Sequence, residues 1–282
     1  MKVLIVGGTS TLGRVLKPVL SEFAEVITAG RTGCDVYLDL SDPIEKIELP
    51  QGIDVVVNTA AHFGGKDFED MFEATRVNVL GALKLSQACF KSNVRHLVHI
   101  SSINANLGNA SDYYGMYALS KKQSDEVVQL FCSSFHLPCS ILRPSQLYGN
   151  EDAFRKHQLF LYNAVDRAAR NENITIYGAK DALRNYIHID DFTEIISLVV
   201  KNRVEGLFTC TSTINVSLTQ IANAAIDAFC SISKVIFLRD MESIQDNVFP
   251  YDDSLYQKIK YFPQISIEEG MKRIAAFRLS RS

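Results

Sequence analysis

The sequence lacks an excess of basic residues. Its 282 residues include 29 Lys and Arg against 32 Asp and Glu, which gives a net charge of -3 at pH 7. Proteins that bind nucleic acid or an anionic membrane surface concentrate positive charge, so neither partner is expected. A basic groove for a phosphorylated ligand is still compatible with this charge, because net charge does not describe a single cleft.

Long apolar runs and cysteine motifs are also absent. No stretch approaches the roughly 18 uninterrupted apolar residues of a membrane helix, and the run at residues 3–6 is too short for the core of a signal peptide. The six cysteines form no CxxC pair and no metal-binding pattern, so we expect idle thiols in a reducing compartment and no metal site. These absences predict a soluble, cytoplasmic protein with no membrane partner.

Short apolar runs alternate with longer amphipathic segments in the first half of the chain. The pattern predicts strands at residues 3–6, 26–29, 55–57, 97–100 and 140–142, and helices at residues 12–23, 68–90 and 112–135. Such alternation is typical of an α/β fold with right-handed crossovers and a doubly wound parallel sheet of the Rossmann type. Ligands of these sheets bind outside the carboxyl ends of the strands.

The pattern changes after Pro144, where loops become more frequent. The last long apolar run, at residues 195–200, predicts a strand that returns to the main sheet. We expect one larger domain from residues 1–150 and about 186–209, and a smaller interwoven C-terminal lobe from about 151–185 and 210–282.

A glycine-rich turn follows the first predicted strand. It consists of Gly7, Gly8, Thr9, Ser10, Thr11, Leu12 and Gly13. Glycine permits a tight turn, and the backbone N–H groups at the start of the following helix can approach phosphate oxygens. A plain strand-to-helix turn would also explain the glycines, but the position at the first β-to-α connection favours a site for the pyrophosphate of a dinucleotide.

The end of the second predicted strand bears on which dinucleotide binds. A carboxylate there would accept hydrogen bonds from the adenosine ribose and favour NAD, whereas the nearest charged residue is Arg31. Arg31 can hold a 2′-phosphate, which favours NADP over NAD; the alternative is a solvated surface arginine. Asp39, with Leu40 after it, either lies near the adenine or caps a helix that begins near Pro43.

Tyr117 and Lys121 are four residues apart on a predicted helix, so both side chains lie on one face. A lysine ammonium a few ångströms from a phenol favours the phenolate and lowers the tyrosine pKa toward working pH. Such a tyrosine can exchange a proton with a carbonyl or an alcohol while a cofactor moves a hydride. The spacing alone is weak evidence, because Tyr256 and Lys260 repeat it.

Two serines distinguish the first pair from the second. Ser101 and Ser102 follow the predicted strand at residues 97–100, at the carboxyl end where a reacting oxygen is expected. A hydroxyl there can hydrogen-bond the substrate oxygen that Tyr117 protonates. No such strand precedes Tyr256, so the pair at Tyr117, with one of the two serines, is the predicted catalytic group.

These segments resemble the extended short-chain dehydrogenase/reductase family, which includes NAD(P)-dependent nucleotide-sugar epimerases, dehydratases and reductases. The resemblance runs almost end to end, with Ser10 where the family usually has glycine. It implies that the larger domain binds the dinucleotide and the smaller lobe the substrate. It also implies that Lys121 bonds the nicotinamide ribose and that Asn78 holds a water near this lysine. Further cofactor contacts are implied at Ala60, Ala61 and Pro144.

The resemblance also implies substrate contacts. Arg184 matches the arginine that contacts the substrate diphosphate in nucleotide-sugar members, through the forked bonds of a guanidinium; a structural salt bridge is the alternative. His157 falls roughly where some keto-sugar epimerase-reductases carry a histidine acid. His62, beside the two alanines, is a further candidate for a substrate contact.

Dehydration is disfavoured by the residues after the serines. In dehydratases of the family an acidic pair follows the catalytic hydroxyl, whereas here Ile103 and Asn104 follow Ser102, and Asn104 is a candidate substrate contact. The leading hypothesis is an NAD(P)-dependent oxidoreductase or epimerase that acts on a nucleotide-diphosphate sugar. The alternatives are an NADP-dependent reductase of a non-nucleotide small carbonyl substrate, against which Arg184 argues, and a non-catalytic dinucleotide-binding sensor or scaffold. By resemblance alone, the second and third predicted helices are expected to form a homodimer interface.

Overall fold

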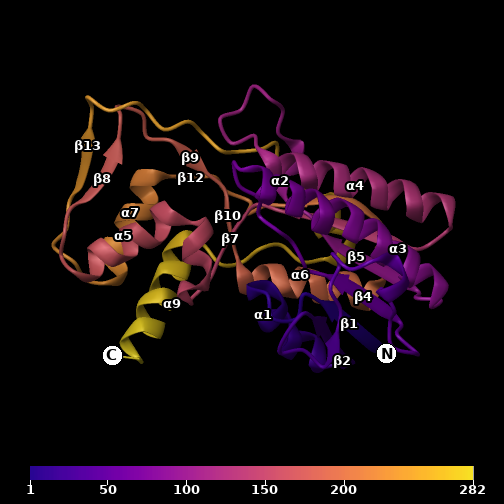
Figure 1. The fold of residues 1–282 in the computed structure, drawn as a ribbon. Helices are drawn as coiled ribbons and strands as arrows, with labels where there is room; N and C mark the ends of the chain where they lie inside the picture. Colours follow the sequence, from indigo (N-terminus) through magenta and orange to yellow (C-terminus); the bar gives the residue numbers. More distant parts are fainter. Residues whose placement is uncertain (282) are drawn as a thin grey trace. The chain divides into compact units, whose positions relative to one another are not determined.

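The computed structural model describes residues 1–281 of the chain (Figure 1). The chain forms two compact units, each assembled from separate stretches of sequence. The first unit contains Met1–Pro144, Thr193–Cys210 and Asp252–Tyr261, and the second contains Ser145–Phe192, Thr211–Tyr251 and the chain from Phe262 onward. Residues 252–261 therefore belong to the first unit, whereas the sequence placed them in the smaller lobe, and residues 145–150 and 186–192 belong to the second unit, whereas the sequence placed them in the larger domain.

The core of the first unit is a seven-stranded parallel sheet. Its strands are β1 (Lys2–Val6), β2 (Glu25–Gly30), β3 (Val36–Tyr37), β4 (Val55–Asn58), β5 (His96–Ile100), β6 (Cys139–Pro144) and β11 (Gly206–Cys210). They lie in the order β11-β6-β5-β4-β1-β2-β3, and every neighbouring pair is parallel. The predicted doubly wound Rossmann-type sheet is thus confirmed. Its switch point, where such sheets bind ligands, lies between β1 and β4.

The central strands are apolar on both faces. Residues 3–6 and 55–57 are almost completely buried, as expected for parallel strands that helices cover on both sides. Burial of one such side chain contributes about 1.5–3 kcal/mol. The sheet therefore holds this unit together and fixes the loops at the ends of its strands.

The first unit also contains helices. They are α1 (Thr11–Ser21), α2 (Phe68–Ala74), α3 (Gly81–Lys91), α4 (Met116–Ser134), α6 (Ile189–Asn202) and α8 (Ser254–Ile259), with a π-helical turn at Thr75–Leu80 and 3-10 helices at Ile44–Lys46 and Ile103–Asn106. The first residues of α6 belong to the second unit. Helices α3 and α4 pack against each other and lie side by side in Figure 1.

Two of these helices differ from the prediction. The segment predicted as one helix at residues 68–90 is interrupted by the π-helical turn, which carries Asn78. Such turns are frequent at functional sites. Helix α4 begins at Met116 and not near residue 112, because Gly115 precedes it in an extended conformation.

The predicted return strand at residues 195–200 is wrong. These residues lie in α6, whose buried apolar side chains include Phe192, Ile195, Ile196, Val199 and Val200. A six-residue apolar run does not distinguish a buried helix from a buried strand. The strand that returns to the sheet is β11.

The second unit contains short strand pairs and packed helices. Parallel pairs are β7 (Gln146–Tyr148) with β10 (Tyr186–His188) and β8 (Ile174–Tyr177) with β13 (Val235–Leu238); the antiparallel pair is β9 (Leu183–Arg184) with β12 (Val216–Ser217). The helices are α5 (Leu159–Ala169), α7 (Leu218–Ala228) and α9 (Ile267–Leu279), with a 3-10 helix at Asp152–His157. Helix α7 packs against both α5 and α9.

Three kinds of feature are missing from residues 1–281. None of their helices combines the length and the apolar character that crossing a bilayer requires. Over the same residues, no cysteine forms a disulfide. In this part of the chain, no three His, Cys, Asp or Glu side chains gather as a metal site would require.

Candidate active site

The glycine-rich turn lies between β1 and α1, at the switch point of the sheet. Gly7 has a φ of +83°, and a Cβ on it would lie 2.7 Å from the backbone nitrogen of Ala60. The N–H groups of Gly7 and Gly8 both donate to the Ala29 carbonyl, at 2.8 and 3.1 Å. A side chain on Gly13 would clash with the Gly7 carbonyl. The turn is therefore as tight as a pyrophosphate-binding turn must be, and its residues fit a dinucleotide.

Ser10, which replaces the usual glycine, is the N-cap of α1. Its Oγ accepts a hydrogen bond from the Gly13 N–H at 3.0 Å and lies 3.0 Å from Thr59 Oγ1. The hydroxyl is thus bonded within the turn and to the end of β4. The rest of the turn consists of exposed Thr9, partly buried Thr11 and buried Leu12.

Arg31 lies exposed directly after β2. The next acid in the sequence is Asp35, whose Oδ2 accepts hydrogen bonds from the hydroxyl and the N–H of Thr28 at 2.7 and 2.8 Å. These bonds lower the pKa of Asp35. Arg31 and Asp35 are therefore both exposed after β2, and Oδ2 of the Asp35 carboxylate is bonded to the β2 backbone.

Asp39 forms a local turn. Its Oδ1 accepts hydrogen bonds from the N–H and the hydroxyl of Ser41, at 2.9 and 2.6 Å. Burial raises the pKa of Asp39, but these bonds and the charge of Arg31 outweigh burial and hold the pKa below its ordinary value. The 3-10 helix after Pro43 has no side-chain cap, so the capping role considered for Asp39 is wrong. Leu40, beside it, is buried.

Tyr117 and Lys121 lie in the first turns of α4 and reach the carboxyl end of β5. Lys121 is only 2% exposed, and its Nζ donates to the Ile100 carbonyl at 2.8 Å. The side chain of Ser102, two residues further along, hydrogen-bonds Tyr117. The fold therefore brings Ser102, Tyr117 and Lys121 together around the end of one strand.

The pKa of Tyr117 differs from the prediction. Burial raises the pKa of this phenol to about 12, the Ser102 hydrogen bond opposes the rise, and the charge of Asp125 adds to it. Burial also lowers the pKa of Lys121 to about 8, with Asp125 opposing. The predicted lowering of the tyrosine pKa by Lys121 is wrong here, because the ammonium bonds a carbonyl and desolvation of the phenolate dominates.

The two serines have different partners. Ser101 Oγ donates to Asp125 Oδ2 at 2.8 Å. Ser102 Oγ instead accepts from the N–H of Asn104 at 3.2 Å and hydrogen-bonds Tyr117. Ser102 is therefore the serine that contacts the phenol, whereas Ser101 bonds the buried Asp125.

Asp125 is a residue that the sequence prediction misses. It is 1% exposed and accepts from Arg143 Nε at 2.7 Å as well as from Ser101. Burial raises its pKa in spite of these bonds. The sequence feature that could have revealed Asp125 is its spacing of four residues from Lys121, which places it on the same face of α4 as Tyr117 and Lys121.

His99, beside Asp125, is neutral. Its Nδ1 lies 3.2 Å from Asn58 Nδ2, and its Nε2 lies 2.9 Å from Ser124 Oγ. An amide nitrogen only donates, so Nδ1 is the acceptor and Nε2 carries the proton. Burial lowers the pKa of His99 to about 3, and the charge of Lys121 adds to this effect.

Asn78 links the loop after β4 to α4. Its Oδ1 accepts from the N–H of His62 at 2.8 Å, and its Nδ2 donates to the His62 carbonyl at 2.7 Å and to Ser120 Oγ at 2.9 Å. The imidazole of His62 lies 3.1 Å from Asp70 Oδ1, through Nε2. Asn78 and His62, which the sequence analysis assigned to ligand contacts, thus also hold this loop in place.

Arg184 and His157 belong to the second unit. Arg184 is 7% exposed, and its Nη1 donates to the carbonyls of Leu183 and Gln245 at 2.8 and 2.7 Å. These bonds fix the guanidinium against the backbone. His157 ends the 3-10 helix at Asp152–His157 and is exposed.

The second tyrosine–lysine pair does not share a helix face. Tyr256 is buried in α8, which ends at Ile259. Lys260 follows in a left-handed conformation with a φ of +53°. The end of α8 before Lys260 therefore separates this pair from Tyr117 and Lys121, which share the longer helix α4.

The sequence matches a known family over most of its length. Residues 3–209 match the profile of the NAD dependent epimerase/dehydratase family. The chain belongs to this family, and its predicted membership of the extended short-chain dehydrogenases/reductases is confirmed. The matched range contains the glycine-rich turn, Ser102, Tyr117, Lys121 and Arg184.

The curated relatives include dehydratases and epimerases. A dTDP-D-glucose 4,6-dehydratase of Dictyostelium discoideum is 23% identical over 209 residues, which cover 66% of this chain and 48% of that protein. A putative UDP-glucose 4-epimerase of Methanocaldococcus jannaschii is 21% identical over 243 residues, which cover 82% of this chain and 78% of that protein. The chain spans about half the length of the dehydratase and of another relative, the protein CapI of Staphylococcus aureus.

Solved structures share the fold over the whole chain. The UDP-glucose 4-epimerase of Thermotoga maritima, solved with UDP-glucose, superimposes with a TM-score of 0.82 at 17% identity and covers 100% of this chain and 99% of that one. A UDP-glucuronic acid 4-epimerase of Bacillus cereus, in complex with NAD, gives 0.78 at 17% identity, covering 98% and 96%. At these identities the likeness concerns the fold.

Proposed function

We propose that the protein is an NAD(P)-dependent oxidoreductase or epimerase that acts on a nucleotide-diphosphate sugar. The observation that carries the proposal is the convergence of Ser102, Tyr117 and Lys121 at the carboxyl end of β5. The tight turn after β1 supports it, because its residues fit a dinucleotide. Solved relatives that bind UDP-glucose or NAD support the substrate class and the cofactor class.

Each residue of this group has a chemical task. The dinucleotide, when bound, supplies the group that accepts or returns a hydride. Tyr117 transfers the proton at the sugar oxygen, Ser102 hydrogen-bonds that oxygen, and Lys121 orients the ribose. With a pKa of about 12, Tyr117 holds its proton at neutral pH and begins as the acid for a carbonyl under reduction. Oxidation of an alcohol needs the phenolate, which the Ser102 hydrogen bond favours.

Dehydration is not part of the proposal. Elimination needs a base beside the catalytic hydroxyl, and the residues after Ser102 are the buried Ile103 and the amide Asn104. Dehydratases do occur among the curated relatives, so this choice rests on the side chains of this chain. An enzyme that returns the hydride to the opposite face is an epimerase, and one that releases oxidised cofactor is a reductase.

NADP is the proposed cofactor, with NAD as the alternative. Arg31 is exposed at the end of β2, and the following acid, Asp35, is bonded to Thr28. A guanidinium at this position can pair with a 2′-phosphate. Because NADPH normally serves net reduction, this choice favours the reductase.

Arg184 is the proposed contact for the substrate diphosphate. Thermal unfolding in the presence of UDP, GDP or dTDP tests this role, because a ligand at 100 times its Kd stabilises the folded state by about 2.7 kcal/mol. We expect one of the three to raise the Tm, and Arg184→Met to lose that rise. No rise with any nucleotide would contradict the substrate class and point to a small carbonyl substrate.

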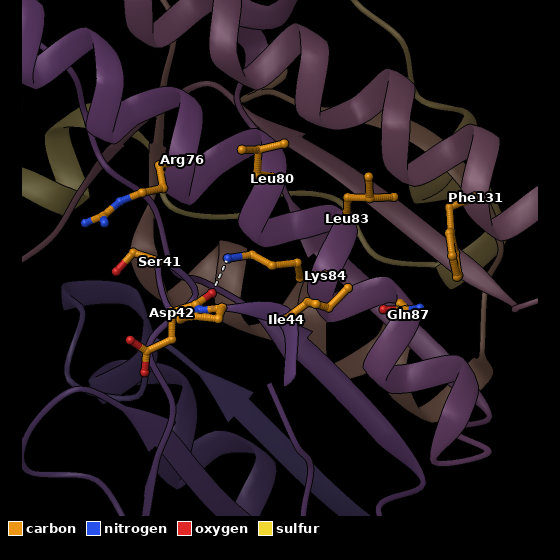
Figure 2. A pocket seen from close by; sticks show the side chains of 10 residues that line it. Ser41, Asp42, Ile44, Arg76, Leu80, Leu83, Lys84, Gln87 and Phe131 are labelled. Carbon is orange, nitrogen blue, oxygen red and sulfur yellow. Dashed lines mark hydrogen bonds between the residues drawn. The ribbon is translucent and has the colours of Figure 1, made fainter. Parts of the chain in front are cut away.

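A homodimer is the proposed assembly, through an apolar helix face formed by the π-helical turn, α3 and α4. The exposed side chains of this face are Leu80, Leu83, Phe90, Leu130 and Phe135. Phe131 adds to it, stacked on Phe135 with ring centroids 4.4 Å apart. An adjoining groove has a volume of about 730 Å³, and Leu80, Leu83 and Phe131 are among the residues that line it (Figure 2). Contiguous exposed apolar surface of this kind marks an interaction site.

The mass in solution tests this assembly. Multi-angle light scattering should give twice the 31.5 kDa of one chain. Leu83→Asp places a charge in the apolar helix face and should give single chains. Leu279→Asp, at an exposed leucine on α9, is the matched control and should leave the dimer intact. A wild-type protein with the mass of one chain would contradict the proposal.

A further inference from the structure

The loop between β4 and α2 places an aromatic side chain on Tyr117. The rings of Phe63 and Tyr117 are stacked, with centroids 4.9 Å apart and planes inclined by 17°. Phe63 is 47% exposed, so burial in the core does not explain its position. We propose that Phe63 is a positioning residue, which holds the Tyr117 phenol at the carboxyl end of β5 and limits its access to water. The proposal rests on the proposed function, in which Tyr117 transfers the proton.

Hydrogen bonds hold the backbone before Phe63. The N–H and the carbonyl of His62 both bond the side chain of Asn78, at 2.8 and 2.7 Å. The same side chain donates to Ser120 Oγ at 2.9 Å, and Ser120 Oγ donates to the Tyr117 carbonyl at 3.1 Å. One buried amide therefore ties the loop to the turn of α4 that carries Tyr117.

A glycine holds the backbone after Phe63. Gly64 has a φ of +70°, a conformation in which other residues are strained. A Cβ on Gly64 would lie 3.3 Å from the Met116 Cβ and 3.5 Å from the Tyr117 nitrogen, so the loop runs directly against the first turn of α4. The stack of the two rings is thus set by fixed backbone on both sides of Phe63.

The stack has two consequences for Tyr117. A phenol turns about two side-chain torsions, and a stacked partner reduces this freedom. The partner also covers one face of the ring and keeps water from it. Because burial is the main reason why the pKa of Tyr117 is raised to about 12, removal of Phe63 should bring this pKa back toward the ordinary value of about 10.

Three variants test the kinetic consequence. Phe63→Ala removes the stack and should lower kcat about tenfold, near the upper end of what a stacked aromatic pair contributes, with little change in KM. Phe63→Tyr keeps a ring and should retain the wild-type kcat. Phe68→Ala removes a ring that is 73% exposed on α2 and is the matched control, expected to change neither constant.

A second measurement does not depend on turnover. The chain has eleven tyrosines, so ultraviolet titration of each variant is compared with the same variant carrying Tyr117→Phe, and the difference isolates Tyr117. We expect the Tyr117 pKa to fall in Phe63→Ala and to stay at the wild-type value in Phe68→Ala. A wild-type kcat or an unchanged Tyr117 pKa in Phe63→Ala overturns the proposal. If the wild type turns over no nucleotide sugar, the proposed function fails, and the titration alone decides whether Phe63 shields Tyr117.

Discussion

Lys121 is the residue at which function and stability conflict most directly. Its ammonium is buried, and burial lowers its pKa from 10.5 to about 8. The unfolded chain therefore binds this proton more tightly than the folded chain, and the folded state is penalised at every pH where the lysine is charged. The two values differ by about 2.5, which corresponds to about 3 kcal/mol at 1.36 kcal/mol for each pH unit.

The substitution Lys121→Met removes the charge and keeps a side chain of similar length. Near pH 7 it should remove the cost of about 3 kcal/mol, but it leaves the Ile100 carbonyl without its donor, which costs about 1–3 kcal/mol. The net change in the free energy of unfolding at neutral pH is therefore small. The pH dependence of this free energy, and not its value at neutral pH, tests the cost of the buried charge. Between about pH 8 and pH 10.5, the wild-type free energy of unfolding should rise by about 3 kcal/mol relative to the variant.

Urea unfolding of the two proteins across this pH range measures the difference. Both chains contain the same tyrosines and the same other lysines, so the contributions of these groups cancel in the comparison. Wild-type and variant curves that run parallel with pH would refute the reasoning about a buried ammonium.

Other variants test other parts of the site. Tyr117→Phe should lower kcat by about 10²- to 10⁴-fold and leave the dinucleotide Kd nearly unchanged, and a wild-type kcat would contradict its role. His99 is buried with a pKa of about 3 against 6.5 unfolded, so stability should fall as the pH drops below 6.5, by about 3 kcal/mol near pH 4. In urea unfolding, the free energy of unfolding of His99→Gln should fall less steeply than that of the wild type as the pH drops below 6.5; an equally steep fall would count against this. Arg31→Ala should weaken NADPH binding about tenfold and leave NADH binding unchanged, as measured by titration; equal losses for both would remove the case for NADP.

The sheet is predictable from the sequence because its strands are apolar on both faces and are separated by longer amphipathic segments. β1, β4 and β5 all lie within one residue of the predicted runs. The same criterion fails at residues 195–200, where a helix buried on most sides presents an equally apolar run. The local sequence pattern does not reveal the tertiary surroundings, and these decide between a buried strand and a buried helix.

The site is predicted less completely, because its contacts join distant segments. Helical spacing shows that Tyr117 and Lys121 share a face, but it does not show that Lys121 Nζ bonds the Ile100 carbonyl. Asp125 lies on α4 and is missed because its partner Arg143 comes from β6, a separate element. Phe63 is missed because its position depends on the path of a loop, and no periodicity describes that path.

The proposed chemistry is tested most directly by following the hydride into the sugar. Wild-type protein is incubated with a panel of nucleotide-linked keto sugars and with reduced dinucleotide that carries deuterium at the transferred position. The masses of the sugars are then measured by mass spectrometry. One sugar should gain a single deuterium with the wild type and none with Tyr117→Phe. Absence of label in every sugar with the wild type, or equal labelling by the variant, would contradict the proposed role of the Ser102, Tyr117 and Lys121 group.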